Sequence, residues 1–140
     1  MTTSVFVYGT LKPDLRYYFV AQQGGEFVKE EGFLEGFDLY HLEPENYPAL
    51  VRGRGKVYGW LYTYTDIERA LVYLDELEGL HLNPPEYERI EVEARPSGKK
   101  VWVYLFLNQE RLTVDTAFKL EGGVWLPSDA ATGHSPKGIA

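Results

Sequence analysis

The sequence predicts an α+β fold, a small closed or nearly closed and mostly antiparallel β-barrel with two short helices. β-rich segments separated by glycines, prolines and charged residues occupy much of the chain, and only two segments have helical spacing. The 140 residues, 44% of them hydrophobic and 15% aromatic, can bury one core and are too few to need a second domain. We therefore expect one domain over residues 1–140, with the Gly- and Pro-containing segment 128–140 as a flexible or strap-like C-terminal tail.

The first β segment, residues 4–8, is apolar on both alternating faces, which is typical of a central strand covered on both sides. Gly9 and Thr10 interrupt this pattern. Residues 12–14 then resemble a helix start, and helical spacing continues through residues 15–22 up to the glycines at 24 and 25. A short helix is therefore expected after the first strand.

Six further β segments are predicted, at residues 26–30, 32–41, 47–51, 56–64, 88–95 and 101–107. The first four suggest a curled sheet in which the basic turn 53–55 is a solvated hairpin tip. The last two form a hairpin across the turn at 96–98. Within 56–64, one face carries Tyr58, Trp60, Tyr62 and Tyr64, and plain core packing accounts for most aromatic stripes of this kind.

A second helix is predicted over residues 67–78, with Asp66 as its N-cap and Gly79 as its C-terminal cap. When the helix is projected at about 100° per residue, Glu78 lies roughly 45° from the centre of the apolar stripe, whereas the other charged residues point away or lie on its border. Burial and the negative end of the helix dipole both favour a protonated carboxyl group. A carboxyl group with a raised pKa is suited to acid–base catalysis. The alternative is that the last turn frays outward, or that Glu78 pairs with Arg89.

The loop Tyr8-Gly9-Thr10-Leu11 joins a buried strand to a helix start, where backbone N–H groups lack intrahelical partners. Gly9 allows a ligand or another backbone segment to approach closely, and Thr10 adds a hydroxyl group. The spacing around Lys12 is not that of a nucleotide-binding P-loop, so a small carboxylate ligand fits the loop better. The alternative is a turn that needs glycine only for its geometry.

Composition excludes several other classes of site. The absence of cysteine removes disulfides, thiol nucleophiles and cysteine-ligated metals, and a formal charge of −7 with scattered basic residues predicts no nucleic-acid partner. The histidines at 41, 81 and 134 lack metal-site spacing, and no serine lies in a GxSxG motif, so neither a metal site nor a serine hydrolase is expected. No membrane-length apolar run or targeting segment occurs, which predicts a cytoplasmic protein without a membrane partner.

Five short motifs occur in a characteristic order. They are VFVYGTLK at 5–12, YPAL at 47–50, VYGWLY at 57–62, LDELEG at 74–79 and YER at 87–89. Together they resemble the γ-glutamyl cyclotransferase and AIG2-like family from about residue 5 to residue 107, and YGTLK combined with LDELEG is the most specific part of the likeness. The resemblance implies a small β-barrel-like α+β fold, a pocket between the glycine-containing loop and the glutamate helix, and no cofactor.

The resemblance also implies roles for individual residues. Carried over by position, Glu78 is the proton acceptor, and the substrate-binding loop consists of Tyr8, Gly9, Thr10 and Leu11. Tyr104, on the strand expected near the pocket, is a further candidate for substrate binding. The implied reaction is attack by the α-amine of a γ-glutamyl group on its own side-chain carbonyl, which releases 5-oxoproline and an amine. No metal, nucleotide or covalent intermediate is required.

The implied partner is a small γ-glutamyl compound, and two alternatives remain. One is a cyclotransferase for a specialised γ-glutamyl amide, such as a γ-glutamyl-ε-lysine isopeptide. The other is a non-catalytic small-molecule-binding module of the same fold. The sequence leaves the leaving amine and the oligomeric state open, and residues after 107 show no pattern that would define the rim of the pocket.

Overall fold

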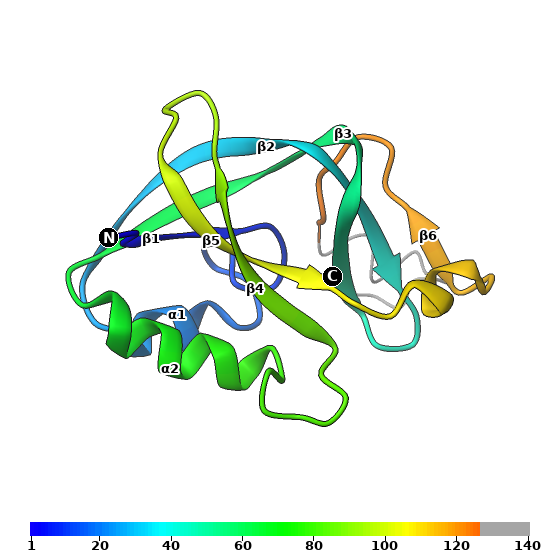
Figure 1. Cartoon of the computed structure of the whole chain (residues 1–140), viewed down its shortest axis with the longest axis horizontal. Helices are drawn as coiled ribbons and strands as arrows, with labels where there is room; N and C mark the ends of the chain where they lie inside the picture. The colour runs from blue at the N-terminus through cyan, green and yellow to red at the C-terminus, as the bar shows by residue number, and fades with distance from the viewer. Residues whose placement is uncertain (127–140) are drawn as a thin grey trace.

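The computed structural model describes residues 1–126, so the expected tail at 128–140 lies outside the described residues. Its six-stranded sheet has the order β4-β5-β1-β3-β2-β6 (Figure 1). The strands are β1 (Ser4–Val7), β2 (Phe27–Leu42), β3 (Tyr47–Tyr64), β4 (Tyr87–Glu93), β5 (Lys100–Phe106) and β6 (Ala117–Lys119). The helices are α1 (Tyr18–Gln23), α2 (Ile67–Leu77) and the short 3-10 helix η1 (Gln109–Thr113). Within residues 1–126, no helix is both long and apolar enough to cross a bilayer.

The sheet curls until its two sides meet. The strand β1 lies in the middle, parallel to β5 and antiparallel to β3, and the other strand pairs are antiparallel. Across the open side, the N–H of Phe33 on β2 donates to the carbonyl of Arg95 at 2.9 Å, and the N–H of Arg95 donates back at 2.8 Å. This bridge joins β2 to the β4–β5 hairpin. The predicted fold class, a nearly closed and mostly antiparallel barrel with two short helices, is confirmed.

The four β segments predicted between 26 and 64 merge into two long paired strands. Instead of ending at each glycine, β2 and β3 stay paired and change register at one bulge, between Glu35 and Phe37. Gly36 has a φ of +87° there, and residues 53–55 lie opposite it within β3. The prediction of a hairpin tip at 53–55 is therefore wrong, because the extra residues are absorbed as an irregularity within the strand.

The helix α1 begins later than predicted because the chain first makes a series of tight turns. The N–H of Lys12 donates to the carbonyl of Gly9 at 2.9 Å, and the N–H of Tyr17 donates to that of Thr10 at 2.8 Å. Asp14 has a φ of +67°, which a continuous helix does not allow. Only residues from Tyr18 onward are helical, so the loop after β1 is longer than the sequence indicates.

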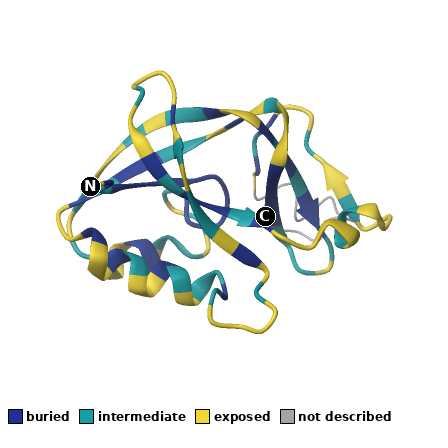
Figure 2. Ribbon diagram, viewed as in Figure 1, coloured by how far each residue is buried: buried dark blue, intermediate teal, exposed yellow. Residues whose placement is uncertain are grey.

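The helix α2 matches its prediction closely. The carboxylate of Asp66 accepts a hydrogen bond from the N–H of Arg69 at 3.1 Å, as an N-cap residue does. At the other end, Gly79 has a φ of +77°, which suits the residue after a helix C-cap. Along α2, buried residues face the sheet and exposed residues face away from it (Figure 2).

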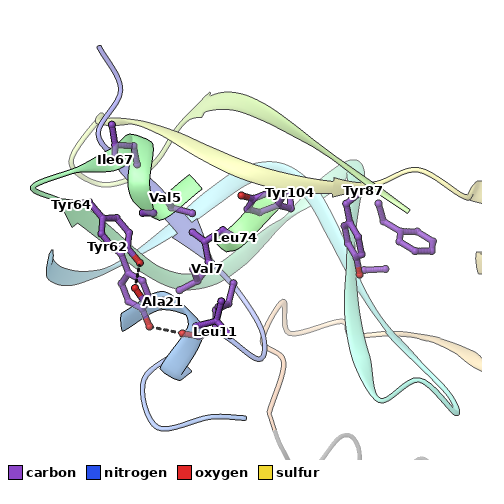
Figure 3. Packing of buried hydrophobic residues seen from close by; sticks show 14 of the residues in the cluster. Val5, Val7, Leu11, Ala21, Tyr62, Tyr64, Ile67, Leu74, Tyr87 and Tyr104 are labelled. Carbon is purple, nitrogen blue, oxygen red and sulfur yellow. Dashed lines mark hydrogen bonds between the residues drawn. The ribbon is translucent and has the colours of Figure 1, made fainter. Parts of the chain in front are cut away.

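Two hydrophobic clusters form the core. One lies between the sheet and the helices, where Leu74 of α2 reaches Val5 and Val7 of β1 (Figure 3). In that cluster the hydroxyl of Tyr62 donates to the carbonyl of Leu11 at 2.7 Å, which ties β3 to the loop after β1. The predicted aromatic stripe thus packs into the core at Tyr62, which is fully buried.

The second cluster fills the inside of the curled sheet, and residues beyond β5 cover it. Trp125 is 3% exposed, and its indole N–H donates to Nδ1 of His41 at 3.0 Å. The Nζ of Lys12 donates to the carbonyl of Trp125, so this segment also reaches the end of the loop after β1. This segment is held by individual side-chain contacts, such as those of Trp125, and not by a helix or strand. The sequence therefore shows no periodic pattern in this region.

Candidate active site

A cavity of about 230 Å³ lies where the loop after β1, the C-terminal end of α2 and β5 meet. It brings together all six residues that the sequence singled out, namely Tyr8, Gly9, Thr10, Leu11, Glu78 and Tyr104. These residues come from three parts of the chain that are far apart in sequence. The fold places them side by side because β1 is flanked by β5 in the sheet and is covered by α2.

The loop after β1 has a stretch, residues 9–11, whose carbonyl groups are paired within the described part of the chain while its N–H groups are not. The carbonyl groups of Gly9, Thr10 and Leu11 accept hydrogen bonds from Lys12, Tyr17 and Tyr62, and these bonds fix the shape of the loop. Within residues 1–126, no acceptor is paired with the N–H groups of residues 9–11. Three successive free donors can hold an anionic group such as a carboxylate.

Gly9 is required by the packing of the loop. A Cβ at this position would overlap the Cγ of Pro48 and lie 2.9 Å from its Cδ. The carbonyl of Pro48 in turn accepts a hydrogen bond from the buried hydroxyl of Tyr87 at 2.7 Å. The β3 residue Pro48 therefore forms one wall of the cavity, and only a residue without a side chain fits against it.

Glu78 is the C-cap residue that follows α2, and its N–H donates to the carbonyl of Leu74 at 3.0 Å. Its side chain is partly buried and lines the cavity. Burial, followed by the negative charges of Glu86 and Asp75, raises the pKa of Glu78 to about 8. The predicted direction of the shift is therefore correct. Repulsion from neighbouring carboxylates adds a cause that the helix pattern did not reveal.

Arg89 does not pair with Glu78, so the alternative in which these two side chains form an ion pair is wrong. Its Nε donates to Oδ1 of Asp75 at 2.9 Å and its Nη2 donates to Oδ2 at 3.1 Å. Because both arms of the guanidinium group contact Asp75, the carboxyl of Glu78 is left facing the cavity without a cationic partner among the described residues. This arrangement keeps the proton affinity of Glu78 high.

Two buried tyrosines, Tyr8 and Tyr104, also line the cavity. The hydroxyl of Tyr8 donates to the backbone carbonyl of Tyr104 at 2.7 Å, and the hydroxyl of Tyr104 donates to Oδ1 of Asp75 at 2.7 Å. Burial raises the pKa of both phenols, and nearby carboxylates raise it further. Both side chains are thus neutral hydrogen-bonding groups rather than bases at neutral pH.

Sequence reasoning missed several residues of the site. Tyr87 and Pro48 belong to the YER and YPAL motifs, but nothing in either motif indicates that Tyr87 donates to Pro48. Glu86 also lines the cavity, and its carboxylate accepts a hydrogen bond from the hydroxyl of Tyr47 at 3.1 Å. Among the described residues, the charged groups that line the cavity are acidic, with neither lysine nor arginine present. Residues 1–126 contain no cluster of three or more His, Asp and Glu that could hold a metal ion.

The fold and the cavity together define a small α+β protein with a pocket between the loop after β1 and the C-terminal end of α2. The chain matches the gamma-glutamyl cyclotransferase, AIG2-like family over residues 5–127, and it belongs to that family. No curated protein sequence matches the chain.

Solved structures show the same fold at low sequence identity. An AIG2-like protein from Mus musculus is 23% identical, with a TM-score of 0.61 over 81% of this chain and 84% of that one. An uncharacterized protein from Pyrococcus horikoshii is 21% identical, with a TM-score of 0.64 over 88% of this chain and 89% of that one. Allophanate hydrolase from Kluyveromyces lactis is 16% identical, with a TM-score of 0.70 over 92% of this chain but only 21% of the enzyme. The fold thus also occurs as one part of a longer protein.

Proposed function

We propose that this protein catalyses ring closure of a γ-glutamyl compound to 5-oxoproline, with release of the amine and with Glu78 as the proton acceptor. Family membership supports a cyclotransferase-like function in general. The observation that carries the specific proposal is the carboxyl of Glu78, partly buried in the cavity beside the loop and with a pKa raised to about 8. An ordinary exposed glutamate, with a pKa near 4.5, is a much weaker base.

The proposed substrate binds with its α-carboxylate on the loop. The unpaired N–H groups of residues 9–11 supply the donors for this carboxylate. The α-amine then lies toward Glu78, and the γ-carbonyl lies close enough to be attacked by that amine. Holding the chain in the folded shape needed for a five-membered ring supplies much of the rate acceleration through orientation.

The chemical steps need one proton carrier. An α-ammonium group has a pKa of about 8, so a carboxylate of matched pKa removes its proton without a large energetic penalty. The freed amine nitrogen attacks the γ-carbonyl carbon and forms the new C–N bond. Glu78 then returns this proton to the leaving nitrogen as the original C–N bond breaks. The second proton that the ring nitrogen must lose passes through Glu78 in the same way, so the amine departs as an ammonium group and Glu78 is again a carboxylate. Charge that develops on the carbonyl oxygen is stabilised by those N–H groups of residues 9–11 that the α-carboxylate does not use.

The charge of the cavity favours particular leaving groups. Glu76, Glu78 and Glu86 line it, and a leaving amine that carries its own carboxylate would be repelled by them. We therefore favour a γ-glutamyl amide whose leaving amine is neutral or cationic over a γ-glutamyl amino acid. The aromatic rings of Tyr47 and Tyr87, which also line the cavity, suit the alkyl part of such an amine.

A non-catalytic binding module remains the rival function. It would use the same N–H donors and the same cavity, but it would not need a carboxyl group of raised pKa at Glu78. A ligand that is bound but never converted is the observation that would favour it.

The proposal is tested by incubating the protein with γ-glutamyl amines, γ-glutamyl-ε-lysine and γ-glutamyl amino acids, and by measuring 5-oxoproline by mass spectrometry. We expect product from at least one γ-glutamyl amine. Binding of these compounds, measured by calorimetry, without product from any of them would support the binding module and refute the enzymatic proposal.

A further inference from the structure

Arg89, Asp75 and Tyr104, which lie outside the proposed proton transfer, are connected by hydrogen bonds. The guanidinium group of Arg89 on β4 contacts both carboxylate oxygens of Asp75, at 2.9 and 3.1 Å. The same Oδ1 of Asp75 accepts the hydroxyl proton of Tyr104 on β5 at 2.7 Å. The guanidinium carbon of Arg89 also lies 4.7 Å from the ring centre of Trp102.

This arrangement restrains Arg89 from two sides. The two-armed contact with Asp75 fixes the plane of the guanidinium group, and the ring of Trp102 supports it at cation–π distance. The ion pair is also partly shielded, because the side chains of Arg89 and Asp75 are 25% and 26% exposed. A mobile ion pair on the surface contributes little to stability, whereas this one is held in a defined geometry.

Asp75 lies three residues before Glu78, a spacing that places the two side chains on neighbouring positions of a helix. The causes that raise the pKa of Glu78 are burial and the charges of Glu86 and Asp75, in that order. Arg89 is not among these causes, although it does lower the pKa of Tyr104. Both hydrogen bonds that the Arg89 guanidinium group makes within residues 1–126 go to Asp75, which makes Asp75 the route by which Arg89 would influence Glu78.

Other groups around Glu78 come from each element packed against it. From α2 and the segment that follows it, these are Asp75, Glu76, His81 and Glu86, and from the strands and the loop they are Tyr8, Tyr87 and Tyr104. Asp75 is the member of this set that is held by a cation.

We infer that Arg89 is a positioning residue: its two-armed contact holds the Asp75 carboxylate against the Tyr104 hydroxyl, which orients Tyr104 and limits the negative charge that Asp75 presents to Glu78. Because the only proton of the Tyr104 hydroxyl is donated to Asp75, the oxygen of Tyr104 offers its lone pairs to the cavity. Tyr104 then accepts a hydrogen bond from a bound amine rather than donating one.

The inference is tested by titrating the Glu78 carboxyl directly, with carbon-13 NMR of a glutamate-labelled protein and Glu78→Gln to assign the signal. This measurement does not depend on any substrate, so it stands even if the proposed reaction is wrong. Loss of Arg89 in Arg89→Met should move the titration midpoint of Glu78 upward by about half to one pH unit. Asp75→Asn should move it downward by a similar amount.

The double variant decides whether Arg89 acts through Asp75. In the Asp75→Asn background, Arg89→Met should shift the midpoint by less than half of its effect in the wild-type protein. An equal shift in both backgrounds, or no shift in either, would overturn the inference. The matched control is Arg95→Met, which removes an exposed arginine paired with Glu35 and Glu93 and should leave the midpoint unchanged.

The melting temperature, as a second measurement, distinguishes a positioning role of Arg89 from a purely structural one. If Arg89 only stabilised the fold, Arg89→Met would lower the melting temperature and leave the Glu78 midpoint in place, which would contradict the inference. Arg89→Lys keeps the charge but loses the two-armed contact, and it is expected to shift the midpoint less than Arg89→Met does. If Arg89→Met does not fold, the titration is carried out with Arg89→Lys instead.

Discussion

Gly9 and Pro48 lie in such close contact that a side chain on Gly9 would overlap the Cγ of Pro48 and lie 2.9 Å from its Cδ. Gly9 in the loop after β1 and Pro48 at the start of β3 thus define one wall of the cavity together, although 38 residues separate them in sequence. A larger residue at position 9 would displace either the loop or Pro48, and both line the cavity.

Gly9→Ala should therefore impair function more than it impairs folding. We expect a loss of stability of about 1–3 kcal/mol from overpacking and a fall in kcat/KM of more than tenfold as the loop is displaced. Urea unfolding and steady-state kinetics measure the two effects. Gly122→Ala is the control, because a Cβ at Gly122 meets no atom within 4 Å. Equal kinetics in the two variants would argue against a role for the loop.

Tyr87→Phe tests the other side of the same wall. The hydroxyl of Tyr87 donates to the carbonyl of Pro48 at 2.7 Å, and the variant removes this buried hydrogen bond. A loss of about 1–3 kcal/mol in the free energy of unfolding is expected, together with a higher KM. Tyr58→Phe removes a hydroxyl from a residue that is 43% exposed and should change neither quantity. A Tyr87→Phe variant as stable as the wild type would show that this hydrogen bond contributes little.

The pH dependence of stability follows from Glu78. Its pKa in the folded protein, about 8, lies above its ordinary value of 4.5, so the native state binds more protons than the unfolded chain between these two values. Stability contributed by the protonated carboxyl is complete below about pH 4.5 and is lost as the pH rises toward 8. Glu78→Gln cannot titrate and so does not lose this stability. The free energy of unfolding of the variant should therefore rise relative to that of the wild type as the pH increases.

Between pH 5 and pH 8.5, the stability of Glu78→Gln relative to the wild type is expected to increase by about 2 kcal/mol. This is less than the full pKa shift of Glu78 implies, because the side chain is partly exposed. Denaturant unfolding of both proteins across this pH range measures it. Glu68→Gln, on the exposed face of the same helix, should run parallel to the wild type. If the stability of Glu78→Gln also changed with pH in the same way as that of the wild type, the pKa of Glu78 would be close to its ordinary value.

The preference for a leaving amine without a carboxylate is tested at Glu86. This side chain lines the cavity and accepts a hydrogen bond from Tyr47. Glu86→Lys should lower kcat/KM for γ-glutamyl amines with a cationic leaving group and raise it for γ-glutamyl amino acids, by about tenfold in their ratio. A ratio that stays constant would show that the charge of Glu86 does not select the leaving group.

The sequence predicts those features of the fold that local rules determine. The cap residues Asp66 and Gly79 mark α2 because each satisfies a local requirement of backbone geometry. The inward placement of Glu78 was visible as a charged residue beside an apolar stripe, and the loop was visible as glycine after a buried strand. These features depend on neighbouring residues alone.

Contacts between distant segments could not be predicted in the same way. The bridge between Phe33 and Arg95 that closes the sheet, and the contact of Arg89 with Asp75, each depend on the complete path of the chain. The register of β2 on β3 also decides that residues 53–55 lie inside a strand rather than at a hairpin tip. A periodic pattern carries no information about such pairings, because it describes one element at a time.

The central claim is that Glu78 moves the proton in ring closure. The most direct measurement is the rate of 5-oxoproline release by Glu78→Gln compared with the wild type and with Glu68→Gln, using whichever γ-glutamyl compound the wild type converts. We expect Glu78→Gln to lose at least a hundredfold in kcat while it still folds and binds the substrate, and Glu68→Gln to keep the wild-type rate. A wild-type rate in Glu78→Gln would contradict the account.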